Sequence, residues 1–300
     1  ASPHLVLALL RSLINVAGVP QENISVGDPS RFVTDNIYNK INGEFPSVRV
    51  IDHSGGGGRV DEQYVREAIS YSVDNGRLER SIGQSFVEAD YVINMPIVKG
   101  HGGQGVTFGG KNWYGALGIS NDHRQNAHNN FNPHRSGGFR YMTFADWLAH
   151  EHLGGKTMLV VTDFLFGTRS LGGTPNHKWN LEPFNGDWPS SVLMSMDGIA
   201  VDSVAIDFFR TEYPNAPDMG KADMYLHEAA VRDGEGRAPS GTRYDPEGDG
   251  TYAPSMGIHE HWDNPQNKNY VGIDLVRVPV TGPGQAAVCG NGICETPDEA

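Results

Sequence analysis

The feature that most constrains the fold of this 300-residue chain is a short apolar run followed directly by a glycine-rich loop. The run, at residues 90–98, is rich in β-branched side chains, which predicts a strand that Pro96 ends or marks as an edge. The loop contains Gly100, Gly102, Gly103, Gly105, Gly109 and Gly110. Because glycine has no side chain to hold a neighbour away, this stretch predicts close approach of the backbone to a ligand.

Several polar side chains stand among these glycines, and we expect five of them to face that ligand. They are Lys99, His101, Thr107, Lys111 and Asn112. We predict His101 as an acid–base group and Lys111 as an electrostatic or covalent anchor. The other three are predicted to bind substrate or cofactor. A helix is expected over residues 112–117, and the amides at its start would favour a phosphate or carboxylate.

Helix and strand patterns alternate along the rest of the chain, which predicts an α/β fold: a doubly wound, mostly parallel sheet with helices on both faces and long loops. Strands are predicted at residues 23–26, 48–51, 157–163 and 271–278, and helices at 77–89, 144–153 and 219–231, with one more starting at Pro3 behind the N-cap Ser2. With 38% apolar residues, the chain can bury a sizeable core. We predict one domain over residues 1–288 and a tail over residues 289–300.

Three aspartates stand where α/β proteins often place ligand groups, at the end of a predicted strand or the start of a helix. Asp28 follows the strand at 23–26, and Asp163 ends the strand at 157–163. Asp202 precedes a helical stripe of apolar residues. All three are predicted to bind substrate or cofactor. For Asp28 and Asp202 the alternative is that each caps a helix.

Two groups of histidines are candidate metal ligands, since neutral imidazole is a common ligand of transition metals. His123 and His128 lie in the polar segment at residues 121–134, which is either a metal-binding or substrate-covering loop or a solvated excursion. If the segment around His259 and His261 is extended, both imidazoles point to one side and can share a metal. The alternative is that they are surface residues before the strand at 271–278.

The charge of the chain and the distribution of its apolar residues limit the kinds of binding partner that we expect. The formal net charge is −13, with scattered basic residues, which argues against nucleic acid or an anionic membrane surface as a partner. No apolar run approaches the roughly 18 residues that a membrane helix needs. We therefore expect a small polar or anionic ligand and no membrane span.

The only two cysteines, Cys289 and Cys294, lie in the sequence CGNGICETPDEA at the end of the chain. Their spacing fits a small disulfide loop, and an oxidising compartment would suit it; the alternative is two free thiols. The tail resembles the start of Cys-rich repeats in secreted bacterial proteins. That resemblance implies an extracytoplasmic location and further Cys-rich modules C-terminal to Ala300.

The chain also resembles an uncharacterised family, called domain of unknown function 362, in three places. The first combines a strand ending in VIN-x-P, then K-x-H, a Gly- and Thr-rich loop and GKNW-x-G; the others are MDGIAVDSVAIDFF at residues 196–209 and YDPEGDGTYAPSMGIHEHWDNP at residues 244–265. The last is typical of secreted members. The resemblance implies a further strand with polar site residues before Ala1, and it implies no activity.

The glycine-rich loop is similar, in addition, to that of nickel-pincer lactate racemases, where a lysine carries a covalently tethered nickel cofactor. His101 and Lys111 stand ten positions apart at its two ends. This resemblance implies a divalent transition metal as cofactor, as a nickel-pincer adduct on Lys111. The chain departs from the pattern at Phe108, where a glycine is expected, and it has no counterpart of the racemase's upstream catalytic histidine.

Two functions follow as hypotheses. One is an extracytoplasmic metal- or cofactor-dependent enzyme that acts on a small anionic or hydroxylated substrate by isomerase or oxidoreductase chemistry. The other is a non-catalytic extracellular binding or surface protein on the same scaffold. An enzyme requires His101 and Lys111 to converge in one place, whereas a binding protein does not.

Overall fold

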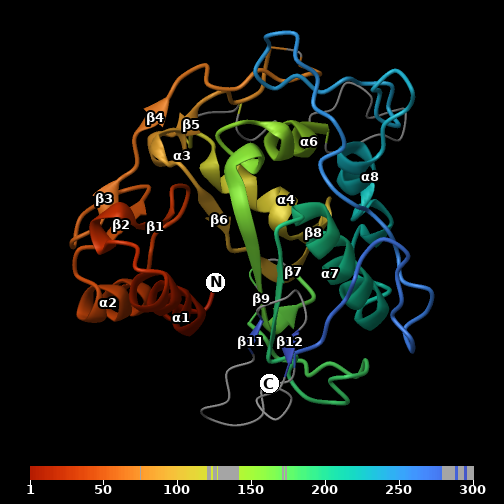
Figure 1. Cartoon of the computed structure of the whole chain (residues 1–300), viewed down its shortest axis with the longest axis horizontal. Coiled ribbons are helices and arrows are strands. Elements are labelled where there is room, and N and C mark those ends of the chain that lie inside the picture. Colours follow the sequence, from red (N-terminus) through yellow and green to blue (C-terminus); the bar gives the residue numbers. More distant parts are fainter. Residues whose placement is uncertain are drawn as a thin grey trace.

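The central element of the fold is a mixed sheet in which β9, Thr157–Thr168, pairs with strands on both sides (Figure 1). The computed structural model describes residues 1–74, 76–119, 123, 127, 142–170, 172 and 174–278, together with the backbone of 288–289 and 294–295. Within it, β9 runs parallel to β6, Val92–Asn94, and β7, Ile97–His101, and antiparallel to β10, Ser191–Ser195. The edge strand β8, Gly105–Thr107, pairs antiparallel with β7.

A smaller parallel sheet lies to one side of this main sheet (Figure 1, red and orange). It consists of β1, Ser25–Asp28, β2, Arg49–Asp52, and β3, Val60–Asp61. Helices α1, Pro3–Arg11, and α2, Asp35–Glu44, pack with it around an apolar cluster that includes Val6, Ile41 and Val50. The predicted start of α1 is confirmed, because Ser2 is its N-cap and the Ser2 side chain accepts a hydrogen bond from His4 N.

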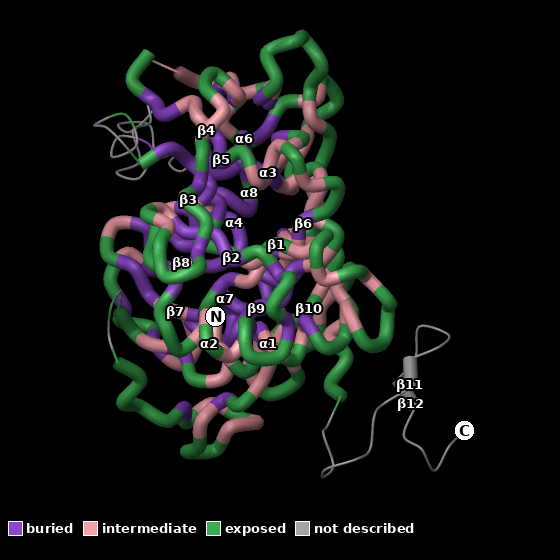
Figure 2. The backbone as a smooth tube through the Cα atoms, turned by 90° about the vertical axis from the view of Figure 1, so that its left-hand side faces the viewer, coloured by how far each residue is buried: buried purple, intermediate pink, exposed green. Residues whose placement is uncertain are grey.

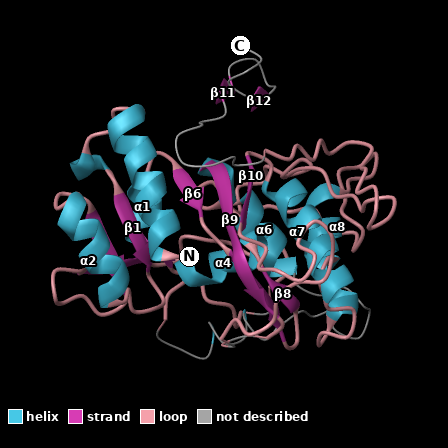
Figure 3. Ribbon diagram, turned by 90° about the horizontal axis from the view of Figure 1, so that it is seen from below, coloured by secondary structure: helices cyan, strands magenta, loops and turns pink. Residues whose placement is uncertain are grey.

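Four helices, α4, α6, α7 and α8, lie on one side of β9 (Figures 2 and 3); α4 and α7 contact the strands of the main sheet, and α6 and α8 pack on these two helices. Their bounds are Gly109–Asn112, Met142–Ala149, Gly198–Glu212 and Met224–Ala230, and a 3-10 turn, η3, continues α4 over Trp113–Ala116. Trp147, Phe164, Trp179 and Phe209 are buried at the centre of the main apolar cluster. The α/β class is therefore confirmed, with the strands divided between two main sheets.

The remaining elements are short and connect these layers. They are η1, Ser12–Val16; η2, Gln21–Asn23; the antiparallel pair β4, Tyr64–Val65, and β5, Ile82–Gly83; α3, Gln84–Glu88; η4, Gly154–Lys156; η5, Met219–Lys221; and the antiparallel pair β11, Val288–Cys289, and β12, Cys294–Glu295. No helix in the described ranges combines the length and the apolar character that a membrane crossing requires. The predicted domain bounds stay a prediction.

Several predicted elements differ from the observed ones. The strand expected at 90–98 is two strands, β6 and β7, because Pro96 has no N–H for the ladder; its carbonyl instead accepts from Asp163 N at 2.8 Å. The helix expected at 77–89 is restricted to α3, since Ile82 pairs with Val65 as part of β5. Residues 271–278 form no strand, and most of their side chains are exposed or half-buried.

Candidate functional site

The glycine-rich stretch that was predicted as a loop is a β-hairpin followed by a helix. His101 belongs to β7, Thr107 belongs to β8, and α4 begins at Gly109. The register pairs Lys99 with Thr107 and His101 with Gly105. Because side chains alternate along a strand and cross-strand partners share a face, Lys99, His101 and Thr107 project from the same face of the hairpin. The structure thus brings three of the predicted residues together.

His101 is the most enclosed titratable group on this face, with 6% of its surface exposed. Its Nδ1 lies 2.6 Å from the Gly102 carbonyl oxygen, which can only accept, so Nδ1 carries the proton of the neutral ring. Burial and then the charge of Lys111 lower the pKa of His101 to about 4, and the charge of Lys99 acts in the same direction. His101 and the two lysines therefore lie within electrostatic reach of one another, and the neutral ring offers Nε2 as a base.

Lys111 is as enclosed as His101, with 6% of its surface exposed. Its Nζ lies 5.0 Å from the centroid of the Tyr114 ring, in cation–π contact. Lys99 is half-buried, and burial together with the positive charge of Arg31 lowers its pKa, whereas Asp28 opposes that shift. Two cationic side chains thus flank one imidazole, an arrangement that favours an anionic ligand.

Thr107 adds a polar group that lacks a partner. Its Oγ1 is buried, and it has no hydrogen-bond partner among the residues that the structure describes. A buried hydroxyl without a partner costs stability, so such groups often mark the place of a ligand or water. Thr107 is therefore positioned to bind a polar group that reaches the hairpin face beside Lys99.

Asp202 caps a helix, as the alternative prediction had it, but the helix is α4 rather than its own. It lies inside α7, whose N-cap is Asp197, and it is fully buried. Its carboxylate accepts hydrogen bonds from Gly109 N at 2.9 Å and Gly110 N at 2.8 Å, as well as from the Tyr225 hydroxyl at 2.6 Å. The amides at the start of α4, which we expected to bind a ligand anion, are thus occupied by the protein's own carboxylate.

This contact also explains two of the glycines. A Cβ atom on Gly110 would lie 2.4 Å from the Tyr225 ring, and one on Gly109 would lie 3.0 Å from the Asp202 carboxylate. At Gly109 and Gly110 the space that a side chain would need is thus filled by other parts of the protein. The same is true at Gly100 and Gly105, whereas a Cβ on Gly102 would have no atom within 4 Å. The expectation that these glycines admit a ligand is therefore wrong for most of them.

Asp28 and Asp163 lie where the small sheet and the main sheet meet. Asp28 ends β1, is exposed and accepts hydrogen bonds from Ser30, while a Cβ on Gly115 would come within 3.6 Å of it. It caps no helix, because α2 begins later behind Thr34. Asp163 is 6% exposed and accepts from Ser2 N at 2.5 Å. It lies within β9 rather than at its end, because β9 continues for five residues beyond the predicted strand.

Figure 3 shows the N-terminus between β1 and α4, which places the first residues of the chain beside these aspartates. The electrostatic contacts agree, since Asp163, Asp28 and Lys99 all act on the Ala1 amine, whose pKa is lowered chiefly by burial. Lys99 and the two aspartates thus share one region of the molecule, around the N-terminus.

Asn112 is exposed, and its side-chain hydrogen bond joins it to β6 of the main sheet rather than to the hairpin. Its Nδ2 donates to Asn94 Oδ1 at 2.7 Å, and Asn94 Nδ2 donates to the Gly109 carbonyl at 3.0 Å. Asn94 is buried at the end of β6 and was not predicted as a site residue, although it is the Asn of the VIN-x-P motif. These contacts give Asn112 and Asn94 a supporting part: they fix α4, and with it Lys111, against the main sheet.

The predicted metal-ligating histidines do not form one group. His123 is exposed, and His128 lies outside the described residues. His259 and His261 do lie side by side, with ring centroids 4.9 Å apart. His259 faces His227, a residue that we did not predict, at a centroid distance of 4.4 Å. His261 contacts two carboxylates, with Nδ1 2.7 Å from Asp207 and Nε2 3.2 Å from Asp223.

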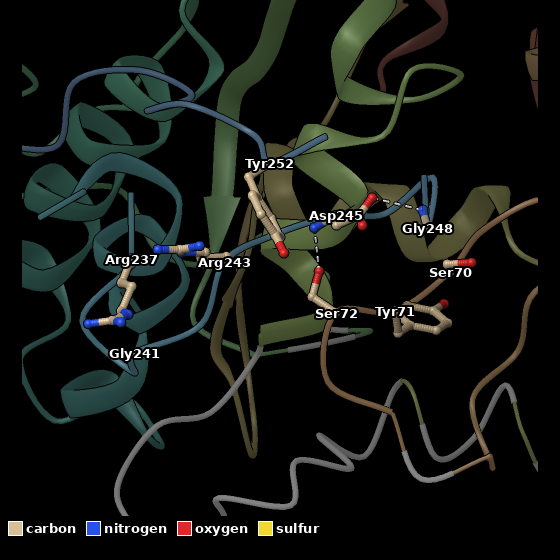
Figure 4. Close-up of a pocket in the computed structure, with 9 residues that line it drawn as sticks. All are labelled: Ser70, Tyr71, Ser72, Arg237, Gly241, Arg243, Asp245, Gly248 and Tyr252. Atoms are coloured by element: carbon tan, nitrogen blue, oxygen red, sulfur yellow. Dashed lines mark hydrogen bonds between the residues drawn. The ribbon is translucent and has the colours of Figure 1, made fainter. Parts of the chain in front are cut away.

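A separate hollow of about 570 Å³ lies away from the hairpin (Figure 4). Arg237 and Arg243 line one end, and Asp245 and Ser72 line the other, where Asp245 N donates to Ser72 Oγ at 2.7 Å. Both arginines pair with Glu235, and the Asp245 carboxylate is satisfied by backbone amides that include Gly248 N. The charged groups of this hollow thus have partners within the protein.

The low pKa of His101 gives a direct test of the site. In the Lys111→Met variant we expect this pKa to rise from about 4 toward the ordinary value of 6.5, because one of its two lysine charges is removed. Titration of the imidazole resonances by NMR measures the change. Lys111→Arg keeps the charge and should leave the pKa low. Equal values in all three proteins would mean that Lys111 does not act on His101.

The same pKa affects stability with a definite sign. The unfolded chain protonates this histidine near 6.5 and the folded protein near 4, so the unfolded state binds more protons between these values. The contribution of His101 to stability is therefore present above about pH 6.5 and is lost as the pH falls toward 4.

The comparisons with known proteins identify a family and no relative of known activity. A family model described as "Domain of unknown function (DUF362)" matches residues 2–207, which include the hairpin, α4 and most of α7. No curated protein and no solved structure matches the chain.

Proposed function

The chain belongs to the DUF362 family, and from this premise we propose that it is an enzyme in which Lys99 and Lys111 bind a small anionic substrate and His101 moves a proton. The observation that carries the proposal is the shared face of the hairpin, where an enclosed, neutral imidazole lies within the electrostatic reach of two cations. Lys111 is buried and Lys99 is half-buried, and because desolvation of an ammonium group is costly, a bound anion would offset part of that cost.

The proposed substrate is a small carboxylate with a hydroxyl or amino group on the carbon next to it. Its carboxylate would neutralise Lys99 and Lys111, and its second polar group would reach the unpartnered Thr107 hydroxyl. Once that negative charge is bound, the positive field on His101 weakens and its pKa rises toward the working pH, where an imidazole is an effective base. Substrate binding would thus activate the base.

The reaction step follows from these positions. Nε2 of His101 takes the proton from the carbon next to the carboxylate, the C–H bond breaks, and its electron pair delocalises into the carboxylate. The ammonium groups of Lys99 and Lys111 stabilise the added charge. Return of the proton to either face of that carbon regenerates the base, so the net reaction is an isomerisation that needs no oxidant or reductant.

A tethered nickel cofactor on Lys111, which the resemblance to the racemases implies, does not fit the described arrangement. Lys111 is enclosed and in contact with the Tyr114 ring, so a nucleotide-sized group on Nζ would have to displace its surroundings. The proposed step therefore uses Lys111 only as a fixed charge.

The proposed location is extracytoplasmic. The register pairs Cys289 with Cys294 across β11 and β12. This supports the small disulfide loop expected from the cysteine spacing, and such a loop persists only in an oxidising compartment.

Exchange of carbon-bound hydrogen tests the proposed activity. The protein is incubated in D2O with a panel of 2-hydroxy- and 2-aminocarboxylates, and the α-proton signals are followed by NMR. We expect the signal of at least one compound to disappear at a rate proportional to the amount of protein. Calorimetry on the same panel tests the alternative function: binding without exchange would identify a non-catalytic binding protein, and neither binding nor exchange would contradict both proposals.

A further inference from the structure

A second cluster of polar side chains, none of which belongs to the proposed site, is formed by Asp223, His227 and His259. Asp223 is the N-cap residue of α8, His227 belongs to that helix, and His259 comes from the extended segment beyond it. One potential ligand atom of each lies within 4.8 Å of the others. All three positions fall outside the residues matched by the family model.

The tautomer of His259 is set by its neighbour Ser203. The Ser203 hydroxyl donates its single proton to the Ile199 carbonyl at 2.8 Å, so its oxygen can only accept from His259 Nδ1, which lies 2.8 Å away. Nδ1 is therefore protonated, and Nε2 carries the lone pair. This Nε2 is buried and has no hydrogen-bond partner in the part of the chain that the structure describes. Metal-ligating histidines are held in this way, with the second nitrogen anchored by a hydrogen bond.

The carboxylate of Asp223 is anchored as well. Its Oδ2 accepts from Arg210 at 2.5 Å and from His261 Nε2 at 3.2 Å. The other nitrogen of His261 contacts Asp207, whose second oxygen accepts from Trp262 N at 3.0 Å. Both ring nitrogens of His261 are thus used by carboxylates, which makes it a positioning residue for Asp223 and leaves His227 as the second imidazole of the cluster.

We propose that Asp223, His227 and His259 bind a divalent transition metal ion of the zinc class. Two imidazoles and one carboxylate are a common ligand set for zinc, whereas calcium and magnesium prefer oxygen ligands alone. Zinc holds such ligands at about 2.0–2.2 Å, so the three atoms must draw closer than their present separation. His227 is exposed and free of core packing, and its rotation can close that distance.

The exposure of His227 also decides what kind of site this is. Three protein ligands leave a fourth tetrahedral position, and the exposed His227 places the cluster at the surface of the protein. A water molecule or an anionic ligand can occupy that position. The proposal does not rest on the proposed function of the hairpin, because none of its ligands contributes to that site.

Metal titration tests the site without any assay of activity. The whole chain is stripped of metal with a chelator and titrated with Co2+, followed by its visible absorption bands, and then with Zn2+ by calorimetry. We expect one equivalent to bind, with the absorption of a four-coordinate site. His227→Ala should weaken Zn2+ binding by about 100-fold, and Ser203→Ala, which frees His259 Nδ1, by about 10- to 100-fold with an altered Co2+ spectrum.

His4→Ala is the matched control, because His4 is an exposed histidine on α1 and should leave both titrations unchanged. Thermal unfolding of the chelator-treated proteins shows whether each variant is folded, and His227→Ala should unfold at the temperature of the unaltered protein. The proposal is overturned if Zn2+ binds His227→Ala and the unaltered protein with equal affinity, or if no stoichiometric binding occurs. Loss of binding in His123→Ala with retention in His227→Ala would also overturn it.

Discussion

Replacing Asp202 with alanine will lower the free energy of unfolding by about 3–5 kcal/mol. The side chain is fully buried, and it accepts hydrogen bonds from two backbone amides and the Tyr225 hydroxyl. The substitution leaves three buried donors without an acceptor, and each such group costs about 1–3 kcal/mol, partly offset because a buried charge is removed. Urea unfolding followed by far-UV circular dichroism measures the loss.

Two further variants separate the capping of α4 from general packing. Tyr225→Phe removes one donor and leaves both amides satisfied, so we expect a loss of only about 1 kcal/mol. Asp202→Asn keeps one acceptor oxygen and should lie between Tyr225→Phe and Asp202→Ala. If Asp202→Ala is no less stable than Tyr225→Phe, the amides of Gly109 and Gly110 do not depend on this carboxylate.

Burial raises the pKa of Asp202 to about 6, against the opposing effect of its three hydrogen bonds. The folded protein therefore protonates Asp202 more readily than the unfolded chain does. Burial of the charged carboxylate lowers the free energy of unfolding. This destabilisation is fully present above about pH 6 and declines as the pH falls toward 3.8. The stability difference between Asp202→Asn and the unaltered protein should accordingly be smallest near pH 7 and grow on acidification toward pH 4.

Replacing His101 with glutamine will reduce the exchange of the substrate's α-proton by about 100- to 10,000-fold, the range that a general base contributes. Glutamine keeps a polar side chain of similar length but cannot take up a proton. The affinity for the carboxylate should persist, because Lys99 and Lys111 are unchanged. NMR exchange rates and calorimetry on the same substrate measure the two effects separately.

Replacing a lysine of the site should lower the affinity for the substrate, which replacing His101 should leave unchanged. Lys99→Met removes one of the charges that act on His101, so substrate binding weakens, whereas Lys178→Met, at an exposed lysine paired with Asp187, changes neither binding nor exchange. A His101→Gln protein that exchanges α-protons at the normal rate would remove His101 from the mechanism. A Lys99→Met protein with unchanged affinity would remove the electrostatic anchor.

Local sequence patterns predicted the elements that depend on neighbouring residues. The cap and proline at the start of α1, the strand that became β2 and the helix that became α8 were all placed close to their observed positions, because each is formed by side chains within a few residues of one another. The prediction of a helix over residues 77–89 was wrong in its first part, because pairing of β4 with β5 overrode the helical pattern.

The roles that the sequence did not predict depend on distant partners. Asp202 is separated from Gly109 by more than ninety residues, and His259 from Ser203 by more than fifty. His227 follows Asp223 by four positions, a spacing that puts both on one side of a helix, but nothing in the sequence directs that side toward His259. The spacing of apolar residues in a sequence indicates a helix or a strand. It does not indicate which faces of different helices and strands pack against one another.

The sequence alone thus determined the α/β class, the glycine-rich stretch and the residue types that it presents, because backbone geometry and burial patterns act over short separations. Only the tertiary structure decided which of these residues converge. Packing of α7 against α4 turned an expected ligand group, Asp202, into a cap, and packing of the segment around His259 against α8 completed a cluster with Asp223 and His227. Such contacts depend on the complementary shapes and charges of whole faces, which form only when the chain has folded.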